Sequence, residues 1–337
     1  MIRLISICVV LFTLLLGCAI PDAYQSVKGT TMGTTYSVIY QGHDSFKSDI
    51  DELLVEINNE VSTFISSSDI SKYNQTDSTF EMDVNSQHFL KNWEKSIQIY
   101  NQSDGYFDPS LMPLINYWGF GYKEKVPRVS VDSTAVSEMM KSVGLNKIEK
   151  KGTQLIKPNS SAQLDFSAIA KGYAVDAIAQ SLHQKKVKNY LVEVGREVYA
   201  KGQNPRGGKW KIGINTPLEK ADLNEIEMVI EISNNGVASS GNYRNFYIVG
   251  KKKYGHTINP HSGYPSLNDM LATTVVAENS MTADAHATGF MAMGLEKAIG
   301  IVEELENVEA CFFYSDKNGA INKKYSNGFI QYVAGEK

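Results

Sequence analysis

Two polar side chains spaced four residues apart are suited to holding a divalent cation. Asp284 and Thr288 lie in the helix-forming segment 283–289, so their oxygens fall on one face of that helix. Carboxylate, hydroxyl and backbone carbonyl oxygens are the hard ligands that Mg²⁺ prefers. A carboxylate at the start of a helix beside a small packing residue gives the same spacing without a metal. Taken alone, the pair favours that simpler interpretation.

A lysine and a histidine stand in segments suited to phosphate chemistry. Lys171 lies in the small-residue helix start 168–172, where backbone N–H groups can approach a phosphate and an ammonium adds positive charge. His256 precedes a turn rich in Pro and Gly, and an imidazole can take up a proton near neutral pH. Taken singly, a surface lysine and a structural histidine are the commoner interpretations.

Aromatic residues suited to flanking a flat ring occur in one polar segment. Tyr106 and Phe107 stand beside Asp108 and Pro109, although packing in the core explains two aromatic residues equally well. The motifs of other nucleotide and hydrolytic sites are absent from the sequence: it has no G-x-G-x-x-G after a strand, no P-loop, no H-E-x-x-H and no G-x-S-x-G. The sequence therefore does not support a Rossmann, P-loop, classical zinc or serine-hydrolase site.

Composition places the chain among folded globular proteins. It has 337 residues, of which 42% are hydrophobic, and a formal net charge of -4. No strong positive field is expected, so nucleic acid is not a predicted partner. The length allows one large domain or two closely joined ones, and no segment has the composition of a linker.

The N-terminus indicates export and lipid anchoring. An apolar run, Leu4–Leu16, follows Arg3 and is too short to span a bilayer, which is typical of a signal peptide. It ends in Leu-Leu-Gly-Cys18, which resembles a bacterial lipoprotein signal. We therefore expect a signal peptide at 1–17, a lipidated tether at 18–28 with the lipid on Cys18, and a domain at 29–337. A plain secretory signal with an incidental cysteine remains the alternative.

Hydrophobic periodicity predicts helices early in the chain and strands later. Helices are expected at 48–64, 89–100, 132–143, 167–185, 283–293 and 295–305. Strands are expected at 35–41, 190–194, 210–214, 227–232, 246–249, 273–276 and 310–314, while 239–244 has the composition of a tight polar turn. Cys311, in the apolar run 310–314, is predicted to lie in the core. This order of elements indicates an α+β fold with a mainly antiparallel sheet and packed helices.

Six short segments, taken together and in order, resemble the ApbE-type FAD:protein FMN transferases. These segments are Gly29–Thr34, Gly105–Gly121, Leu164–Tyr173, Ser239–Arg244, His256–Pro265 and Ala283–Gly289. The resemblance implies an ApbE-like, T-fold-related architecture that binds FAD in an extended cleft. It also implies a lipid-anchored enzyme of the bacterial cell envelope whose catalytic domain lies outside the cytoplasm, on the periplasmic side.

The resemblance also implies a role for each matching residue. His256 matches the general base, and Cys18 fits the lipidation site of the family. Mg²⁺ ligands are matched by Asp284, Thr288 and the backbone carbonyl of Ala168. Contacts to FAD are matched by Met32, Tyr106, Phe107, Asp108, Asp165, Lys171 and Ile258. Three positions depart from the usual family pattern: Asn259 replaces an acid, Arg196 replaces a glycine, and Ala287 replaces an acid found in some members.

The reaction implied by the resemblance is Mg²⁺-dependent transfer of FMN from FAD to a threonine or serine hydroxyl, with release of AMP. The implied acceptors are exported flavoprotein domains of membrane redox complexes. Two alternatives remain open from the sequence: a Mg²⁺-dependent FAD pyrophosphatase that uses water, and a lipoprotein that binds flavin without catalysis. Incubation of the protein with FAD, with and without an acceptor, separates the three.

Overall fold

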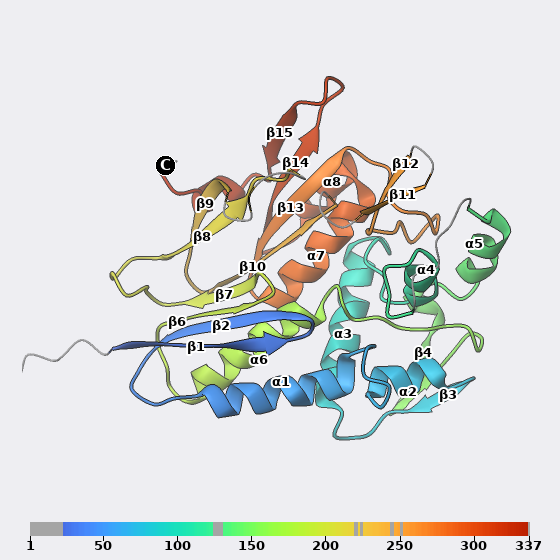
Figure 1. Cartoon of the computed structure of the whole chain (residues 1–337), viewed down its shortest axis with the longest axis horizontal. Coiled ribbons are helices and arrows are strands. Elements are labelled where there is room, and N and C mark those ends of the chain that lie inside the picture. The colour runs from blue at the N-terminus through green and yellow to red at the C-terminus, as the bar shows by residue number, and fades with distance from the viewer. Residues whose placement is uncertain are drawn as a thin grey trace, which may run out of the picture.

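A computed structural model describes residues 23–123, 131–218, 222, 225–242, 246–249 and 252–335 of the chain. Within these residues, most helices come in the first half of the chain, eight strands follow one another from β6 to β13, and a large sheet runs through the molecule (Figure 1). The predicted signal peptide at 1–17 and the predicted lipidation site Cys18 lie outside the described residues.

The large sheet has the strand order β1-β2-β6-β7-β10-β13-β14-β15, and every neighbouring pair is antiparallel. Figure 1 shows it running from the blue N-terminal hairpin to the red C-terminal one. The strands are β1 (Tyr24–Thr31), β2 (Thr34–Gln41), β6 (Tyr190–Val194), β7 (Glu197–Lys201), β10 (Asn235–Gly241), β13 (Met270–Ala277), β14 (Val308–Ser315) and β15 (Ile321–Tyr325). The predicted antiparallel sheet is thus confirmed.

Helices cover one face of this sheet. Helix α6 (Ala170–Gln184) lies against β6 and β7, and α7 (Ser280–Met293) lies against β10 and β13. Helices α1 (Lys47–Val61) and α3 (Gln87–Gln102) pack outside them, and α8 (Leu295–Glu304) packs on α7 and β14. The buried faces of α1 and α3 follow the helical period, as the sequence predicts. Helix α7 is buried almost all round, because small residues let it sit between the sheet and α6.

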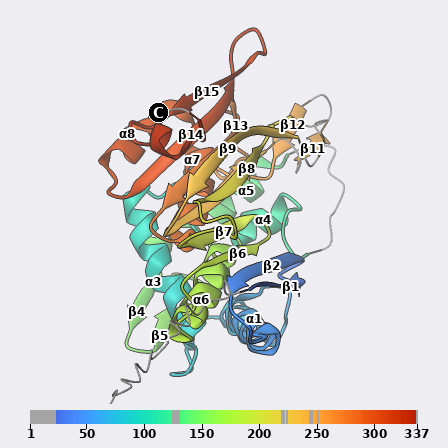
Figure 2. The same ribbon diagram turned by 90° about the vertical axis from the view of Figure 1, so that its left-hand side faces the viewer.

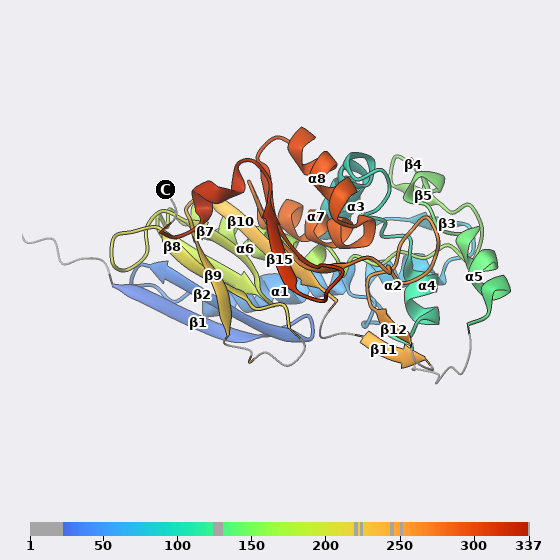
Figure 3. The same cartoon turned by 90° about the horizontal axis from the view of Figure 1, so that it is seen from above.

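A hairpin covers the opposite face of the sheet. Its strands are β8 (Trp210–Asn215) and β9 (Ile226–Ile232), and it is closed by a short 3₁₀ helix, η2 (Phe329–Tyr332). Trp210, Ile230 and Phe329 form a second core there with Cys311 and Phe313, so the predicted burial of Cys311 is confirmed. Figures 2 and 3 show this hairpin on the side of the sheet that faces away from α7.

Smaller elements form a lobe beside the helical face. They are α2 (Asp69–Gln75), α4 (Met112–Tyr117), α5 (Ser133–Met140), η1 (Leu145–Lys147), the three-stranded sheet of β3 (Thr79–Glu81), β5 (Gln154–Ile156) and β4 (Glu149–Lys151), and the hairpin of β11 (Phe246–Val249) and β12 (Lys252–Gly255). Trp118 anchors part of this lobe by donating its indole N–H to the carbonyl of Gly263 at 2.8 Å. The lobe thereby fixes the segment that carries His256 and Ile258.

Three boundaries differ from the sequence predictions. Residues 24–28, predicted as tether, form the first part of β1, so a tether can reach no further than Ala23. Segment 239–241, predicted as a turn, completes β10 because it pairs with β13. Helix α6 begins at Ala170, since Asp165 binds the N–H of Ser167 and holds residues 165–167 in a turn.

Within the described residues, no helix combines the length and the apolar character that crossing a bilayer requires.

Candidate active site

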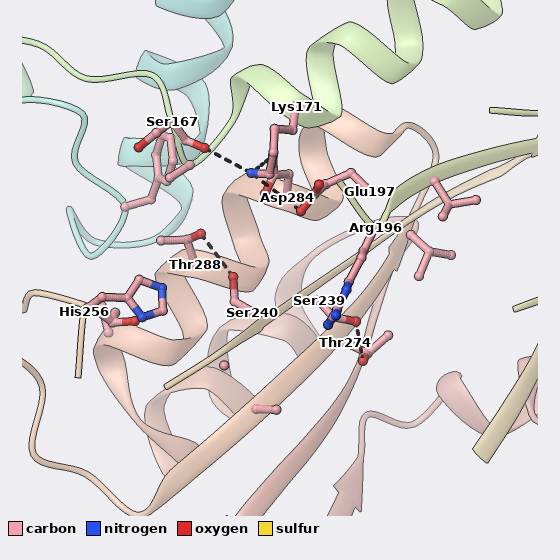
Figure 4. Close-up of a pocket in the computed structure, with 18 of the residues that line it drawn as sticks. Ser167, Lys171, Arg196, Glu197, Ser239, Ser240, His256, Thr274, Asp284 and Thr288 are labelled. Atoms are coloured by element: carbon pink, nitrogen blue, oxygen red, sulfur yellow. Dashed lines mark hydrogen bonds and ion pairs between the residues drawn. The ribbon is translucent and has the colours of Figure 1, made fainter. Parts of the chain in front are cut away.

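A cavity of about 760 Å³ opens where the start of α6, one face of α7 and the ends of β7 and β10 meet. Side chains from the helical face and from the β8 hairpin both line it, so the cavity reaches both faces of the sheet. Figure 4 shows Lys171, Asp284, Thr288 and His256 directed into it from different elements. Residues far apart in the sequence therefore meet in one space.

The first turn of α7 is held by a neighbouring helix. Asp176 of α6 accepts hydrogen bonds from the backbone N–H groups of Ser280 and Met281, both at 2.8 Å, and Asn279 caps the same turn through Thr282 N–H at 2.9 Å. Burial raises the pKa of the Asp176 carboxyl to about 7, even though these two N–H groups oppose the shift. The start of α7 is thus fixed against α6 by a buried carboxyl group.

A glycine lets these two helices approach closely. A Cβ atom on Gly172 would lie 2.4 Å from the carbonyl oxygen of Ser280, so no other residue fits there without displacement. The Gly172 N–H instead donates to Asp284 Oδ2 at 3.0 Å. Asp284 is buried, and its position is therefore set by both helices.

Lys171 lies between two acidic side chains. Its Nζ is 3.6 Å from Asp284 Oδ2 and 3.6 Å from Glu197 Oε1, and it donates to the Ser167 carbonyl at 3.2 Å. Burial lowers the pKa of this ammonium, but the carboxylates of Asp284 and Glu197 outweigh burial and hold the pKa above its usual value. Lys171 therefore stays charged beside the cavity.

Glu197 is a buried acid with an unsatisfied atom. Its Oε2 has no hydrogen-bond partner among the described residues, and burial raises the pKa of the carboxyl above its usual value, although the charge of Lys171 opposes the shift. Sequence reasoning missed this residue. The signal for it was an acid at the first position of β7, directly after the Gly195-Arg196 turn.

Thr288 and His256 lie further along the cavity. Thr288 Oγ1 is 3.3 Å from Ser240 Oγ of β10, one turn after Asp284 on the same face of α7. His256 is partly buried, and its ring centroid is 6.2 Å from that of Phe120. In Figure 4 the His256 ring and Thr288 face the same space.

Two more acids are fixed by the segments that follow them. Asp108 accepts the N–H of Ser110 at 2.8 Å, and Asp165 accepts that of Ser167 at 3.1 Å. Burial raises the pKa of both carboxyls. The Asp165 N–H donates to the Pro109 carbonyl at 2.8 Å, so the two segments are joined at the cavity wall.

Most of the residues singled out from the sequence line this cavity: Tyr106, Phe107, Asp108, Asp165, Ala168, Lys171, His256, Ile258, Asp284 and Thr288. Met32 does not. It lies in the β1–β2 turn with a φ of 49° and packs on the main core, next to a second, smaller depression that includes Asn58. Their individual roles stay predictions.

Side chains from the hairpin face of the sheet complete the cavity, and none of them was assigned an individual role from the sequence. Ser239 Oγ and Thr274 Oγ1 are 2.8 Å apart, and Lys211 of β8 pairs with Glu231 at 3.2 Å. Arg196, noted in the sequence only as a departure, has a φ of 88° and reaches toward this hydroxyl pair (Figure 4). Single hydroxyl groups in strands carry no spacing signal, so the sequence could not reveal them.

The donor set around Asp284 fits a hard divalent cation. Its described contacts use Oδ2, which leaves Oδ1, and the Thr288 hydroxyl and Ala168 line the same cavity. Among the described residues, no three His, Cys, Asp or Glu side chains form a metal cluster.

The chain is similar to proteins of known name. Its residues 32–312 match the model of the ApbE family. It is 34% identical over 312 residues to the FAD:protein FMN transferase of Haemophilus influenzae, covering 89% of each chain. It is also 34% identical over 296 residues to that of Vibrio cholerae, covering 86% of this chain and 87% of the relative.

Solved structures give the same result. The structure of the flavin transferase ApbE from Vibrio cholerae matches with a TM-score of 0.83 and 31% sequence identity. The match covers 93% of this chain and 100% of that one. The flavinyl transferase ApbE of Pseudomonas stutzeri matches with a TM-score of 0.80 and 30% identity, covering 92% of this chain and 97% of that one. On the match of both sequence and fold over most of its length, the chain belongs to the ApbE family.

Proposed function

We propose that this protein is a FAD:protein FMN transferase that acts on a threonine or serine hydroxyl of an exported flavoprotein domain. The names of the similar enzymes from Haemophilus influenzae and Vibrio cholerae support the activity. The observation that carries the proposal is the convergence of Asp284, Thr288, Lys171 and His256 on one cavity of about 760 Å³. A space of this size suits a dinucleotide.

The reaction exchanges one phosphorus–oxygen bond for another. The acceptor hydroxyl oxygen attacks the phosphorus atom on the FMN side of the FAD pyrophosphate, and a new O–P bond forms. The bridging P–O bond breaks, and AMP leaves with that electron pair. The proton of the hydroxyl must go to a base. The main barrier is the negative charge that gathers on the phosphates.

His256 supplies the base in this proposal. It lies on the cavity wall beside Phe120 and shares the space with Thr288. An imidazole near neutral pH accepts the hydroxyl proton as the O–P bond forms. A positioned base of this kind contributes about 10²- to 10⁴-fold in rate.

Lys171 and the oxygen ligands deal with phosphate charge. Lys171 stays protonated between Asp284 and Glu197 and points its ammonium at the cavity. Asp284 Oδ1, the Thr288 hydroxyl and the Ala168 carbonyl are the groups that would hold Mg²⁺. When bound, Mg²⁺ would neutralise negative charge on the pyrophosphate and on the departing AMP.

The aromatic and acidic residues of the cavity would orient FAD. Tyr106 offers a flat face, whereas the Phe107 ring is buried in the main core behind the cavity wall, and Ile258 is a buried apolar residue of the same cavity. Asp108 and Asp165 are held by Ser110 and Ser167, which leaves both acids fixed at the wall. A fixed wall lowers the entropy cost of placing the phosphorus atom next to the base.

The direct test uses purified protein with FAD, MgCl₂ and an exported FMN-binding domain of a membrane redox complex. Intact-mass spectrometry of the acceptor should show one added FMN, and chromatography should show an equal amount of AMP. Free FMN and AMP with an unmodified acceptor would instead identify a pyrophosphatase. Bound but unchanged FAD would identify a flavin-binding protein.

Lipid anchoring at the cell envelope is part of the same proposal. The apolar run before Cys18 supports it, and Ala23 is the last residue before the sheet begins. Cys18→Ser should move the protein from the membrane to the soluble envelope fraction and remove labelling by radioactive palmitate. An unchanged membrane fraction and unchanged labelling would contradict the assignment.

A further inference from the structure

Strand β10 leaves a short free edge inside the cavity. It pairs with β13 from Gly236 to Gly241, but with β7 only from Asn235 to Val237. The β6–β7 turn ends the neighbouring hairpin at this point, so residues 239–241 have no strand partner on that side within the described part of the chain. All three line the cavity. A strand edge of this kind presents backbone N–H and C=O groups that require partners.

The two faces of this edge lead to different chemistry. Ser240 points to the helical face, where its Oγ is 3.3 Å from Thr288 Oγ1. Ser239 points to the opposite face, where its Oγ is 2.8 Å from Thr274 Oγ1. Successive residues of any strand added here must alternate in the same way. A residue opposite Ser240 would therefore face Thr288 and the Asp284 side of the cavity.

We propose that the acceptor protein binds as an extended segment that adds to the free edge of β10, with its reactive hydroxyl residue opposite Ser240. This inference rests on the proposed transferase function and specifies how its second substrate enters. Directly opposed residues of neighbouring strands have Cβ atoms about 5 Å apart, which brings the hydroxyl beside Thr288. Backbone hydrogen bonds supply binding that does not depend on the acceptor's side chains.

Arg196 stands where the neighbours of the reactive residue would point. It is exposed, and no hydrogen-bond or ion-pair partner of its guanidinium occurs among the described residues. It adopts a φ of 88°, a strained conformation for a non-glycine residue that often marks a functional position. Its donors can reach carbonyl oxygens or an acid of the incoming segment.

Separate groups serve the two substrates in this arrangement. Lys171 and the oxygens of Asp284 and Thr288 lie on the helical side, where the pyrophosphate of FAD must react. The free edge and Arg196 lie where the cavity crosses to the hairpin face. In this proposal the phosphates of FAD do not bind at that end of the cavity. A polypeptide has the repeat of donors and acceptors that a strand edge matches, whereas a dinucleotide does not.

The first experiment tests the strand geometry with synthetic peptides. The parent peptide spans the residue that the wild-type enzyme modifies in the acceptor domain, with Val in place of that residue so that it inhibits. It should compete with the acceptor domain and not with FAD. N-methylation of its backbone amides, one position at a time, should weaken inhibition about tenfold at every second position and little in between, as expected for alternate ladder bonds.

The second experiment tests Arg196 with a matched control. Arg196→Ala should raise the KM for the acceptor domain about tenfold, as for loss of a hydrogen bond from a charged donor, with unchanged FAD affinity and kcat. Arg206→Ala, in the exposed loop between β7 and β8, should leave all three unchanged. Circular dichroism checks that both variants fold.

The outcomes separate this inference from the function itself. If the wild-type enzyme adds no FMN to the acceptor, both fail. If it does add FMN, three results overturn the inference alone: no inhibition by the parent peptide, competition of that peptide with FAD, or equal effects of N-methylation at all positions. Weakened FAD binding by Arg196→Ala with an unchanged acceptor KM would assign the edge to FAD instead.

Discussion

The carboxylate of Asp284 on α7 accepts a hydrogen bond from the backbone N–H of Gly172 on α6, at 3.0 Å. One oxygen of this acid is thus committed to joining two helices, and the other is left for the cavity. The position of the acid depends on how closely the two helices pack. The predictions below test this coupling and the chemistry that it serves.

Asp284→Asn should abolish Mg²⁺-dependent AMP release while leaving the fold intact. The amide oxygen can still accept the Gly172 N–H, but the negative charge that a divalent cation needs is gone. AMP is measured by chromatography over a range of MgCl₂ concentrations. Glu304→Gln, at an exposed acid on α8, is the control and should behave as wild type. Wild-type metal dependence in the Asp284 variant would refute its assignment as a ligand.

His256→Ala should reduce FMN transfer by about 10²- to 10⁴-fold, the usual contribution of a positioned base. FAD affinity, measured by equilibrium dialysis, should remain unchanged, because the imidazole acts on the acceptor hydroxyl. His43→Ala, at an exposed histidine near the start of the domain, is the matched control. A loss of FAD binding in the His256 variant would instead make it a binding residue.

Gly172→Ala should destabilise the protein by about 1–3 kcal/mol, the cost of overpacking a tight contact. The added methyl group would lie 2.4 Å from Ser280 O and push α6 away from α7. Gly300→Ala in α8 is the control, since nothing lies within 4 Å of its Cβ position. It should add about 0.5–1 kcal/mol of stability. Urea unfolding measures both, and similar shifts in the two variants would contradict the close packing.

Asp176 gives a prediction for the pH dependence of stability. The folded-state pKa of its carboxyl is raised to about 7 from 3.8, so the folded protein binds this proton more tightly than the unfolded chain does. Its contribution to stability is therefore full below about pH 4 and declines as the pH rises to about 7, by up to about 4 kcal/mol. Asp176→Asn should remove this decline in urea unfolding across that range.

The control for this pH experiment is Asp269→Asn, at an exposed position before β13. Its pH dependence should match that of wild type. The amide that Asp176→Asn introduces offers one acceptor oxygen to two N–H groups, so this variant is also expected to lose about 1–3 kcal/mol at acidic pH. The same decline between about pH 4 and about pH 7 in both variants would show that Asp176 does not cause it.

Local patterns predicted the amphipathic elements well. Helices α1 and α3 and strands β6 and β11 fall within a few residues of their predicted ranges, because each carries its own apolar period. The last three residues of strand β10, 239–241, were predicted as part of a turn, since they are small and polar. They belong to the strand because β13 pairs with them, and such pairing is a property of distant residues that no local pattern contains.

In the candidate site too, local sequence predicts some features, whereas others depend on contacts between distant residues. Asp284 and Thr288 share a helix face, and spacing alone predicts this. The approach of Lys171 to Asp284 depends on two helices meeting at Gly172, and the buried Glu197 depends on the β6–β7 turn. Most of the residues that the family resemblance singled out line the cavity, and their individual roles stay predictions. The resemblance gave Ser239 no individual role and did not reveal Thr274 or the free edge of β10, because these contacts arise from the sheet as a whole.

The pairing of β2 with β6 has a consequence for how the protein matures. The N-terminal hairpin finds its partner only after the helices from α1 to α6 have been made, and contacts between such distant residues slow folding. A chain that leaves the ribosome or a translocation channel from its N-terminus must keep β1 and β2 unpaired in the meantime, when their edges are open to aggregation. Any factor that shields this hairpin until β6 arrives would therefore limit aggregation during maturation.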